Sequence, residues 1–221
     1  MDLFLIILII FIPLIAQLGI TTSYNKYKKI GNSKNMTGYD VARNILDRNG
    51  LKDVYIVETR GDLTDHYDPT QKVVRLSSDI YHGESIAAMA VAAHECGHAI
   101  QDKEAYMFMR FRSLIFPVVN IATSISYYII LIGFILQLMD MIYLGIALTF
   151  LGLLFQIVTL PVEFDASKRA NLKLAEYGLC EESDLKGTKA ILKAAAMTYV
   201  AGVLASALQI IRLILAADRR N

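Results

Sequence analysis

Four long apolar stretches constrain the fold of this 221-residue chain more than any other feature. They cover residues 3–20, 115–138, 141–160 and 194–216. A helix needs about 20 predominantly apolar residues to cross about 30 Å of hydrocarbon, and each stretch approaches or reaches that length. The sequence therefore predicts an integral membrane protein with about four transmembrane helices.

The first and last of these stretches each allow a second interpretation. Residues 3–20 could be a cleaved signal peptide, but Asp2 stands where such a peptide carries positive charge, and no small-residue cleavage site follows. We therefore expect a retained membrane anchor. The stretch at 194–216 is either a transmembrane or an interfacial helix, because four polar side chains interrupt it: Tyr199, Ser206, Gln209 and Arg212.

Two polar blocks, residues 21–113 and 162–193, flank a predicted transmembrane hairpin at 115–160. Because two crossings separate the blocks, both emerge on the same side of the membrane. Lys and Arg residues lie beside both blocks and are absent from the predicted connection at Met139 and Asp140, so the positive-inside rule predicts that both blocks are cytoplasmic. Arg219 and Arg220 weigh against that orientation for the last helix.

The charge balance and the cysteine count exclude other classes of protein. Lys and Arg number 22 against 21 Asp and Glu, a net charge of +1, which lacks the basic footprint of a nucleic-acid binder. The two cysteines are too few for a disulfide-rich secreted scaffold and favour a reducing compartment. We expect no nucleic-acid partner. The sequence leaves the oligomeric state open.

The first polar block carries signals for a small α+β domain. Thr37 and Asp40 have capping-box spacing, and the helix that they start is predicted to stop at Asn49–Gly50. β-branched runs at 54–57 and 73–76, with turn residues at 68–71 between segments 63–67 and 72–76, predict a small sheet ending in a hairpin. The alanine-rich segment 85–101 is too short and too flanked by charge to cross a membrane, so it predicts a buried helix. The expected fold is thus α+β, mostly helical, with a small zincin-like catalytic domain.

His94-Glu95-Cys96-Gly97-His98 lies on this predicted buried helix. Histidines at positions i and i+4 share one helix face and can bind one zinc ion, and the Glu after the first histidine can serve as general base. The alternative, two buried histidines satisfied by hydrogen bonds, must explain why half of the chain's four histidines have ligand spacing. Cys96 projects away from the shared face and is predicted to be a packing residue, and Gly97 to permit close backbone approach.

A catalytic zinc site needs a third protein ligand and an open position. The metzincin pattern would require Gly and His where this chain has Gln101 and Glu104, so the ligand must come from elsewhere. We expect Pro161 to end the third apolar helix and Glu163 to begin a new one. Glu163 is the predicted ligand, and Asp165 is the alternative ligand or a hydrogen-bond partner of an imidazole. Both carboxylates could instead be charges favoured at a helix N-terminus.

Several motifs together resemble a known family, the bacterial neutral zinc metallopeptidases of the membrane (the YugP-like group). They are Leu63-Thr-Asp-His-Tyr-Asp-Pro69, Val73-Val-Arg-Leu-Ser77, Ala92 to Gln101, Glu163-Phe-Asp-Ala-Ser167 and Thr198-Tyr-Val-Ala201. The resemblance runs from about Thr37 to the C-terminus. It implies a zinc-dependent peptidase of the bacterial cell membrane, with His94, His98 and Glu163 as ligands and Glu95 as general base.

The layout is also similar to that of prenyl-protein endopeptidases and HtpX-type proteases. In those enzymes a membrane hairpin separates HExxH from a Glu-x-x-Ala-Asp motif, where this chain has Ser167 in place of the Asp.

These residues predict hydrolysis of peptide bonds in a polypeptide substrate in or near the bilayer. His66, Tyr67 and Tyr199 are candidates for stabilising the oxyanion, or are ordinary half-buried polar residues; His66 and Tyr67 end a strand that could also hold an extended substrate. Two other functions remain possible from the sequence. One is a catalytically silent zinc-binding scaffold or quality-control adaptor, and the other is a small transporter component.

Overall fold

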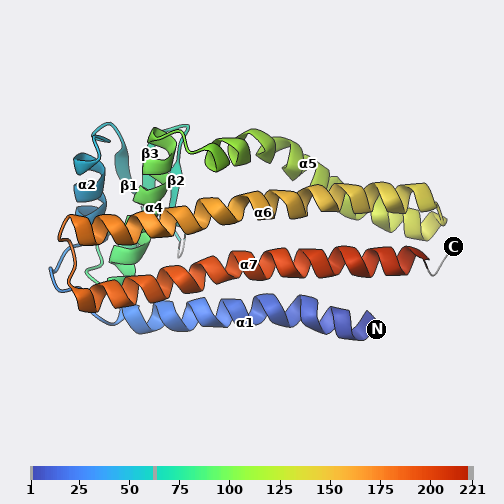
Figure 1. Cartoon of the computed structure of the whole chain (residues 1–221), viewed down its shortest axis with the longest axis horizontal. Coiled ribbons are helices and arrows are strands. Elements are labelled where there is room, and N and C mark those ends of the chain that lie inside the picture. The colour runs from blue at the N-terminus through green and yellow to red at the C-terminus, as the bar shows by residue number, and fades with distance from the viewer. Residues whose placement is uncertain (1, 62–63, 219–221) are drawn as a thin grey trace. The chain divides into compact units, whose positions relative to one another are not determined.

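The computed structural model describes residues 2–61 and 64–218 (Figure 1). Leu63, where the predicted hairpin begins, and the two C-terminal arginines, Arg219 and Arg220, lie outside the described residues. The described chain forms seven helices and three strands, in the order α1 (Asp2–Lys28), α2 (Gly38–Arg48), β1 (Tyr55–Thr59), β2 (His66–Asp68), β3 (Val73–Ser77), α3 (Ser78–Tyr81), α4 (Ile86–Lys103), α5 (Met107–Leu136), α6 (Met139–Glu176) and α7 (Glu182–Asp218).

Four of the helices, α1, α5, α6 and α7, are long and apolar enough to cross a membrane. This agrees with the predicted fold class, including the helix at the C-terminal end. Each helix extends beyond its predicted span into the adjoining polar sequence. The chain divides into two compact units, one made of residues 1–17, 108–161 and 198–221, and the other of Leu18–Met107 and Val162–Met197.

The first of these units is called the membrane-helix unit below. It contains nearly all of α5 and the part of α6 up to Pro161, which together form a hairpin. The hairpin turns at Gln137 and Leu138, not at the predicted Met139 and Asp140, which are already in α6. Gln137 adopts a left-handed conformation (φ 58°), and the Leu138 N–H donates to Gly133 O at 2.9 Å, which closes the end of α5 as a Schellman-type cap does. Asp140 instead lies in the first turn of α6, where a negative charge is favoured by the helix dipole.

Small residues let the helices of this unit approach closely. A Cβ built on Gly152 would lie 2.7 Å from Thr123 Cγ2, so α6 contacts α5 at a point where a side chain would clash. Between α6 and α7, the Ser206 hydroxyl donates to Gln156 Oε1 at 3.0 Å. This bond satisfies a polar pair across two helices, whereas the hydroxyls of Thr149 and Thr159 donate to backbone carbonyls of their own helix.

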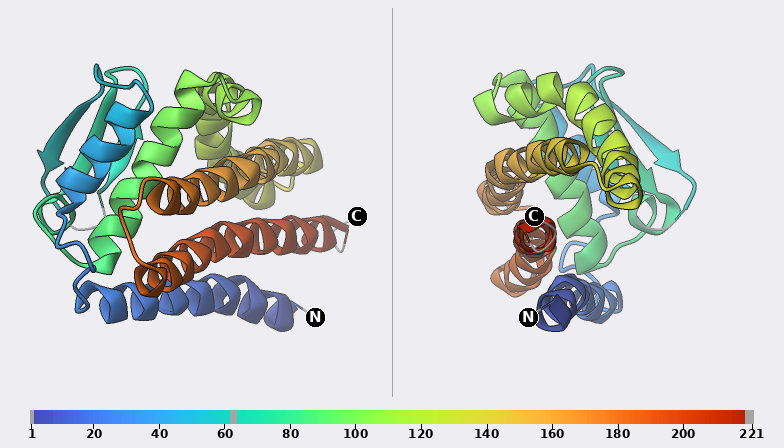
Figure 2. Two further views of the ribbon diagram at one scale, coloured as in Figure 1. Left: turned by 60° about the vertical axis from the view of Figure 1, so that its left-hand side comes forward. Right: turned by 90° about the vertical axis from the view of Figure 1, so that its right-hand side faces the viewer.

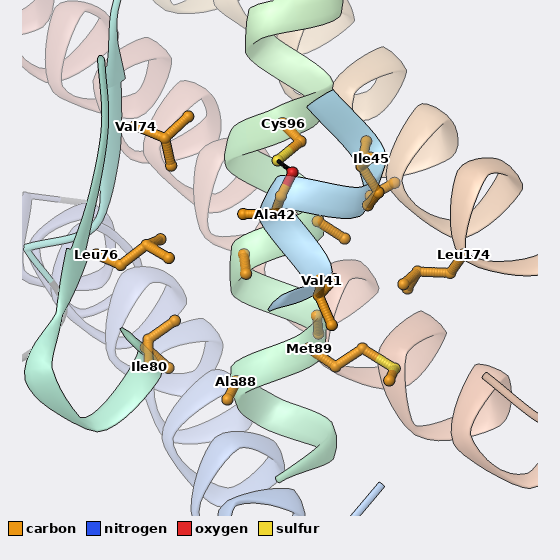
Figure 3. Packing of buried hydrophobic residues seen from close by; sticks show 14 of the residues in the cluster. Val41, Ala42, Ile45, Val74, Leu76, Ile80, Ala88, Met89, Cys96 and Leu174 are labelled. Carbon is orange, nitrogen blue, oxygen red and sulfur yellow. Dashed lines mark hydrogen bonds between the residues drawn. The ribbon is translucent and has the colours of Figure 1, made fainter. Parts of the chain in front are cut away.

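The second unit is built around α4. The capping box at Thr37 and Asp40 is formed as predicted and starts α2. Helices α2 and α4 pack on the same side of a three-stranded sheet (Figure 2). Apolar side chains from the sheet and both helices fill the space between them, including the fully buried Val74, Leu76 and Met89 (Figure 3).

The sheet has the strand order β1-β3-β2. β1 pairs with β3 in parallel, whereas β2 pairs with β3 in antiparallel register, with His66 opposite Arg75 and Asp68 opposite Val73. The predicted hairpin is therefore present between β2 and β3. Among the described residues β2 pairs only with β3, so it is an edge strand of the sheet, and it also contacts α4.

The prediction that Pro161 ends the third apolar helix is wrong. α6 continues without interruption from Met139 to Glu176, with Pro161 inside it. A proline removes one backbone hydrogen bond, and the bonds on either side can carry a long helix past it. Glu163 and Asp165 are consequently in a helix interior, so attraction to the dipole at a helix N-terminus does not explain them.

Candidate metal centre

Two imidazoles from α4 and one carboxylate from α6 converge in the second unit. Potential ligand atoms of His94, His98 and Glu163 all lie within 4.8 Å of one another. Glu163 Oε2 is 3.4 Å from His94 Nε2 and 3.6 Å from His98 Nε2. His98 and Glu163 are buried and His94 is partly accessible.

These separations match the spacing that a zinc ion imposes on its ligands. Ligand atoms about 2.0–2.2 Å from zinc at tetrahedral angles are about 3.3–3.6 Å apart. Both distances from Glu163 to the histidines fall in that range. Two imidazole nitrogens and one carboxylate oxygen also form a donor set that zinc accepts, with one position left open for water. The residues present therefore fit the metal.

Gly97 brings the histidine helix close enough to α6 for this geometry. A Cβ built on Gly97 would lie only 2.5 Å from the backbone oxygen of Ala166, one turn beyond Glu163 on α6. Backbone atoms cannot rotate away from such a clash. The close approach predicted from the sequence is thus confirmed, and it sets the distance between the helices that carry the three ligand candidates.

Replacing Gly97 with alanine should push α4 and α6 apart. We expect a loss of about 1–3 kcal/mol in unfolding free energy, the usual cost of overpacking, with weaker zinc binding. Gly31→Ala is the matched control, since its added methyl would meet no atom within 4 Å. The measurements are thermal unfolding and zinc affinity of both variants. Equal values for Gly97→Ala and Gly31→Ala would refute the role assigned to this contact.

The ring nitrogens that face away from Glu163 also have partners. Ser167 Oγ lies 3.3 Å from His94 Nδ1, and Gln101 Oε1 lies 3.0 Å from His98 Nδ1. Hydrogen bonds of this kind orient metal-binding imidazoles and leave Nε2 for the metal. Ser167 thus meets an imidazole at the position where the related Glu-x-x-Ala-Asp motif has a carboxylate.

Asp165 reaches the histidines indirectly. Its carboxylate accepts a hydrogen bond from Gln101 Nε2 at 2.8 Å and another from Arg169 Nε. Arg169 also pairs with the exposed Glu104 at 2.6 Å. The sequence predicted Asp165 as an alternative ligand or as a direct partner of an imidazole, whereas the imidazole partners in the structure are Gln101 and Ser167.

Glu95 and Cys96 occupy different sides of α4. The Cys96 thiol is fully buried against Ala42 O of α2 at 3.6 Å, which agrees with a packing role (Figure 3). Glu95 is 8% exposed. Burial lowers the pKa of His98, but contact with Glu163 and the negative charges of Glu95 and Glu163 outweigh burial and leave that pKa raised. Because a proton would have to leave before a metal binds, acid should weaken zinc binding.

The three candidates for oxyanion stabilisation lie in different surroundings. The Tyr67 hydroxyl of β2 donates to Asp102 Oδ2 on α4 at 2.9 Å, and burial and this bond raise the pKa of Tyr67, so the phenol stays protonated. His66 is exposed, with Nδ1 2.8 Å from Thr64 O. Tyr199 lies on α7 in the membrane-helix unit. Their catalytic role stays a prediction.

The sequence analysis assigned no role to Gln101, which is fully buried and contacts His98. It appeared there as a mismatch to the metzincin pattern and as the last residue of a family motif, without a role of its own. A usable signal existed, because a residue three positions after a histidine lies on the same helix face. An uncharged amide at that spacing on an otherwise apolar helix would have indicated a partner for the ring.

A His-His-Glu cluster that could hold a metal ion, beside four candidate membrane spans, is the set of features expected of a membrane zinc metallopeptidase of the HExxH-plus-Glu type. The family model described as "Putative neutral zinc metallopeptidase" matches residues 2–218. The chain belongs to this family. It is also 44% identical over 200 residues to the protein named "Putative membrane protease YugP" of Bacillus subtilis (strain 168), an alignment that covers 90% of this chain and 89% of that relative. No solved structure shows significant similarity to the chain.

Proposed function

We propose that this protein is a zinc-dependent endopeptidase that cleaves polypeptides in or near the bacterial cell membrane. The observation that carries the proposal is the convergence of both HExxH histidines with Glu163 at zinc-compatible distances. The family and the four candidate spans support the peptidase activity and the membrane location.

His94, His98 and Glu163 would hold the metal, through Nε2 of each imidazole and a carboxylate oxygen. When bound, zinc would polarise the scissile carbonyl and lower the pKa of a water molecule towards about 7. The ligands carry one negative charge in total, so a divalent ion offsets the buried Glu163 carboxylate.

Glu95 is the proposed general base. Its carboxylate takes a proton from the attacking water as the oxygen bonds to the carbonyl carbon, and then delivers that proton to the amide nitrogen as the C–N bond breaks. One water and one peptide bond thus yield a carboxyl group and an amine. A hydrogen-bond donor such as His66 or Tyr67 would stabilise the negative oxygen of the tetrahedral species.

Strand β2 offers a place for the substrate. It is an edge strand that contacts α4, and its unpaired side can add an extended peptide by main-chain hydrogen bonds. This mode of binding needs little side-chain specificity. It would suit a peptidase that selects substrates by their presence in or near the bilayer.

Chelation tests the proposed function. The purified full-length protein should hold about one zinc per chain, and His94→Ala should hold much less. A chelator should stop cleavage of an unfolded test polypeptide, and added zinc should restore it. Protein that contains less than about half a zinc per chain, with His94→Ala unchanged, would contradict the metal site. Cleavage that persists without metal would contradict the mechanism.

We also propose that the candidate site faces the cytoplasm, on the basis of the positive-inside rule. In a Cys180→Ser background, cysteines placed at the exposed Asn35 or Glu182 should resist a membrane-impermeant thiol reagent in intact cells. A cysteine at Asp140, near the hairpin turn, should react. Labelling of Asn35→Cys and Glu182→Cys but not of Asp140→Cys would reverse the orientation.

A further inference from the structure

The orientation of the Gln101 amide is determined by its surroundings on α6. The side chain is fully buried, and its Nε2 donates to Val162 O and to Asp165 Oδ2, both at 2.8 Å. A backbone carbonyl can only accept. The Asp165 carboxylate also accepts from the Arg169 guanidinium. A flipped amide would turn its oxygen towards two acceptors, so only one orientation is compatible with the site.

This orientation points Oε1 of Gln101 at Nδ1 of His98, 3.0 Å away. An amide oxygen can only accept a hydrogen bond, so Nδ1 must carry the proton. The lone pair of the neutral ring is then on Nε2, the atom 3.6 Å from Glu163 Oε2. We infer that Gln101 is a positioning residue that holds His98 in the Nδ1–H tautomer, with Nε2 ready to bind the metal.

The other histidine lacks an equivalent constraint. Ser167 Oγ lies 3.3 Å from His94 Nδ1, and a hydroxyl can either donate or accept. Ser167 is therefore compatible with both tautomers of His94, whereas Gln101 allows only one for His98. His98 is thus constrained by a residue of its own helix, whereas His94 meets a residue of α6 that leaves its tautomer open.

The constraint extends to the surface of the unit through a chain of side chains. Glu104 pairs with Arg169, Arg169 with Asp165, and Asp165 with Gln101. Each contact limits the rotation of the next side chain towards the site. Asp165 accordingly acts on the site by orienting the Gln101 amide. This role accounts for a carboxylate two residues from Glu163 that is not itself a ligand.

The expected effect of removing this amide follows from the role of such partners. The inference rests on the proposed zinc site, and partners that orient metal ligands typically contribute 10–100-fold to metal affinity. Gln101→Met keeps the volume but removes the acceptor, so zinc affinity should fall by about 10–100-fold.

The tautomer itself can be measured without metal. Zinc-free, ¹⁵N-histidine-labelled full-length Glu163→Ala protein is suited to nitrogen NMR, because no Glu163 carboxylate then competes for a proton on Nε2. At a pH where the imidazole is neutral, the His98 proton should be on Nδ1. The His98 signal is assigned by its absence from a matching His98→Ala variant, and adding Gln101→Met should distribute the proton over both nitrogens. Asn171→Leu, which removes an amide bonded to Ser167 O and Thr188, is the control and should leave the His98 signal unchanged.

Two results would overturn the inference. One is a His98 proton on Nε2 in the zinc-free Glu163→Ala protein, and the other is a Gln101→Met substitution that lowers zinc affinity but leaves the His98 tautomer unchanged. Wild-type protein that binds no zinc would instead contradict the proposed function, and the zinc-free NMR measurement would still report on Gln101. The two failures are therefore distinguishable.

Discussion

Replacing Glu95 with glutamine is expected to reduce peptide hydrolysis by about 10²–10⁴-fold, the usual contribution of a positioned general base. The amide preserves the shape of this buried side chain but cannot take a proton from water. Zinc content and thermal stability should match those of the wild-type protein, because Glu95 is not among the three proposed ligands. The measurement is turnover of a test polypeptide by metal-loaded protein.

This comparison also separates a peptidase from a zinc-binding scaffold. A scaffold would bind zinc but show no turnover that depends on Glu95. The control for Glu95→Gln is Glu176→Gln, which makes the same chemical change at an exposed side chain that pairs with Lys173. Turnover retained by Glu95→Gln would mean that another group accepts the proton, and the mechanism proposed here would be wrong.

Removing the Glu163 carboxylate should have the largest effect on metal binding. Glu163→Ala takes away one of three proposed ligands and leaves two imidazoles around a buried gap. Zinc affinity should fall by at least about 10-fold, and more than for the loss of a partner that only orients a ligand. Competition with a coloured chelator in the purified protein provides the measurement.

Two further substitutions on α6 make this result specific. Glu176→Ala lies on the same helix but on the exposed surface, and it should leave zinc affinity unchanged. Asp165→Ala should weaken binding less than Glu163→Ala, because Asp165 reaches His98 only through Gln101. If Asp165→Ala strips the metal and Glu163→Ala does not, the ligand is Asp165 and the proposed set is wrong.

Features that depend on neighbouring residues could be predicted from the sequence. Apolar length predicts four candidate spans because the bilayer thickness sets the number of residues needed. Hydrogen bonds within four residues define the capping box at Thr37, and turn residues between two β-branched runs define the β2–β3 hairpin. The i and i+4 spacing of His94 and His98 likewise places both rings on one face of a buried helix.

The sequence also predicted a partner carboxylate on the correct side of the hairpin, since two crossings return the chain to the same face. The predicted residue, Glu163, is the one that meets the two imidazoles. The expectation that Glu163 begins a new helix is wrong, because Pro161 does not end α6. A proline weakens a helix locally, but whether the helix breaks depends on the bonds and packing on either side.

Sequence by itself therefore determined the candidate membrane spans, the identity of the HExxH helix and its two candidate imidazole ligands, because each follows from length or short-range spacing. Only the tertiary structure decided how the site is assembled. Contact between the Gly97 and Ala166 backbones sets the distance between α4 and α6, and acceptors on α6 orient the Gln101 amide towards His98. These contacts join residues more than 60 positions apart, and no periodicity encodes which atoms will meet across two packed helices.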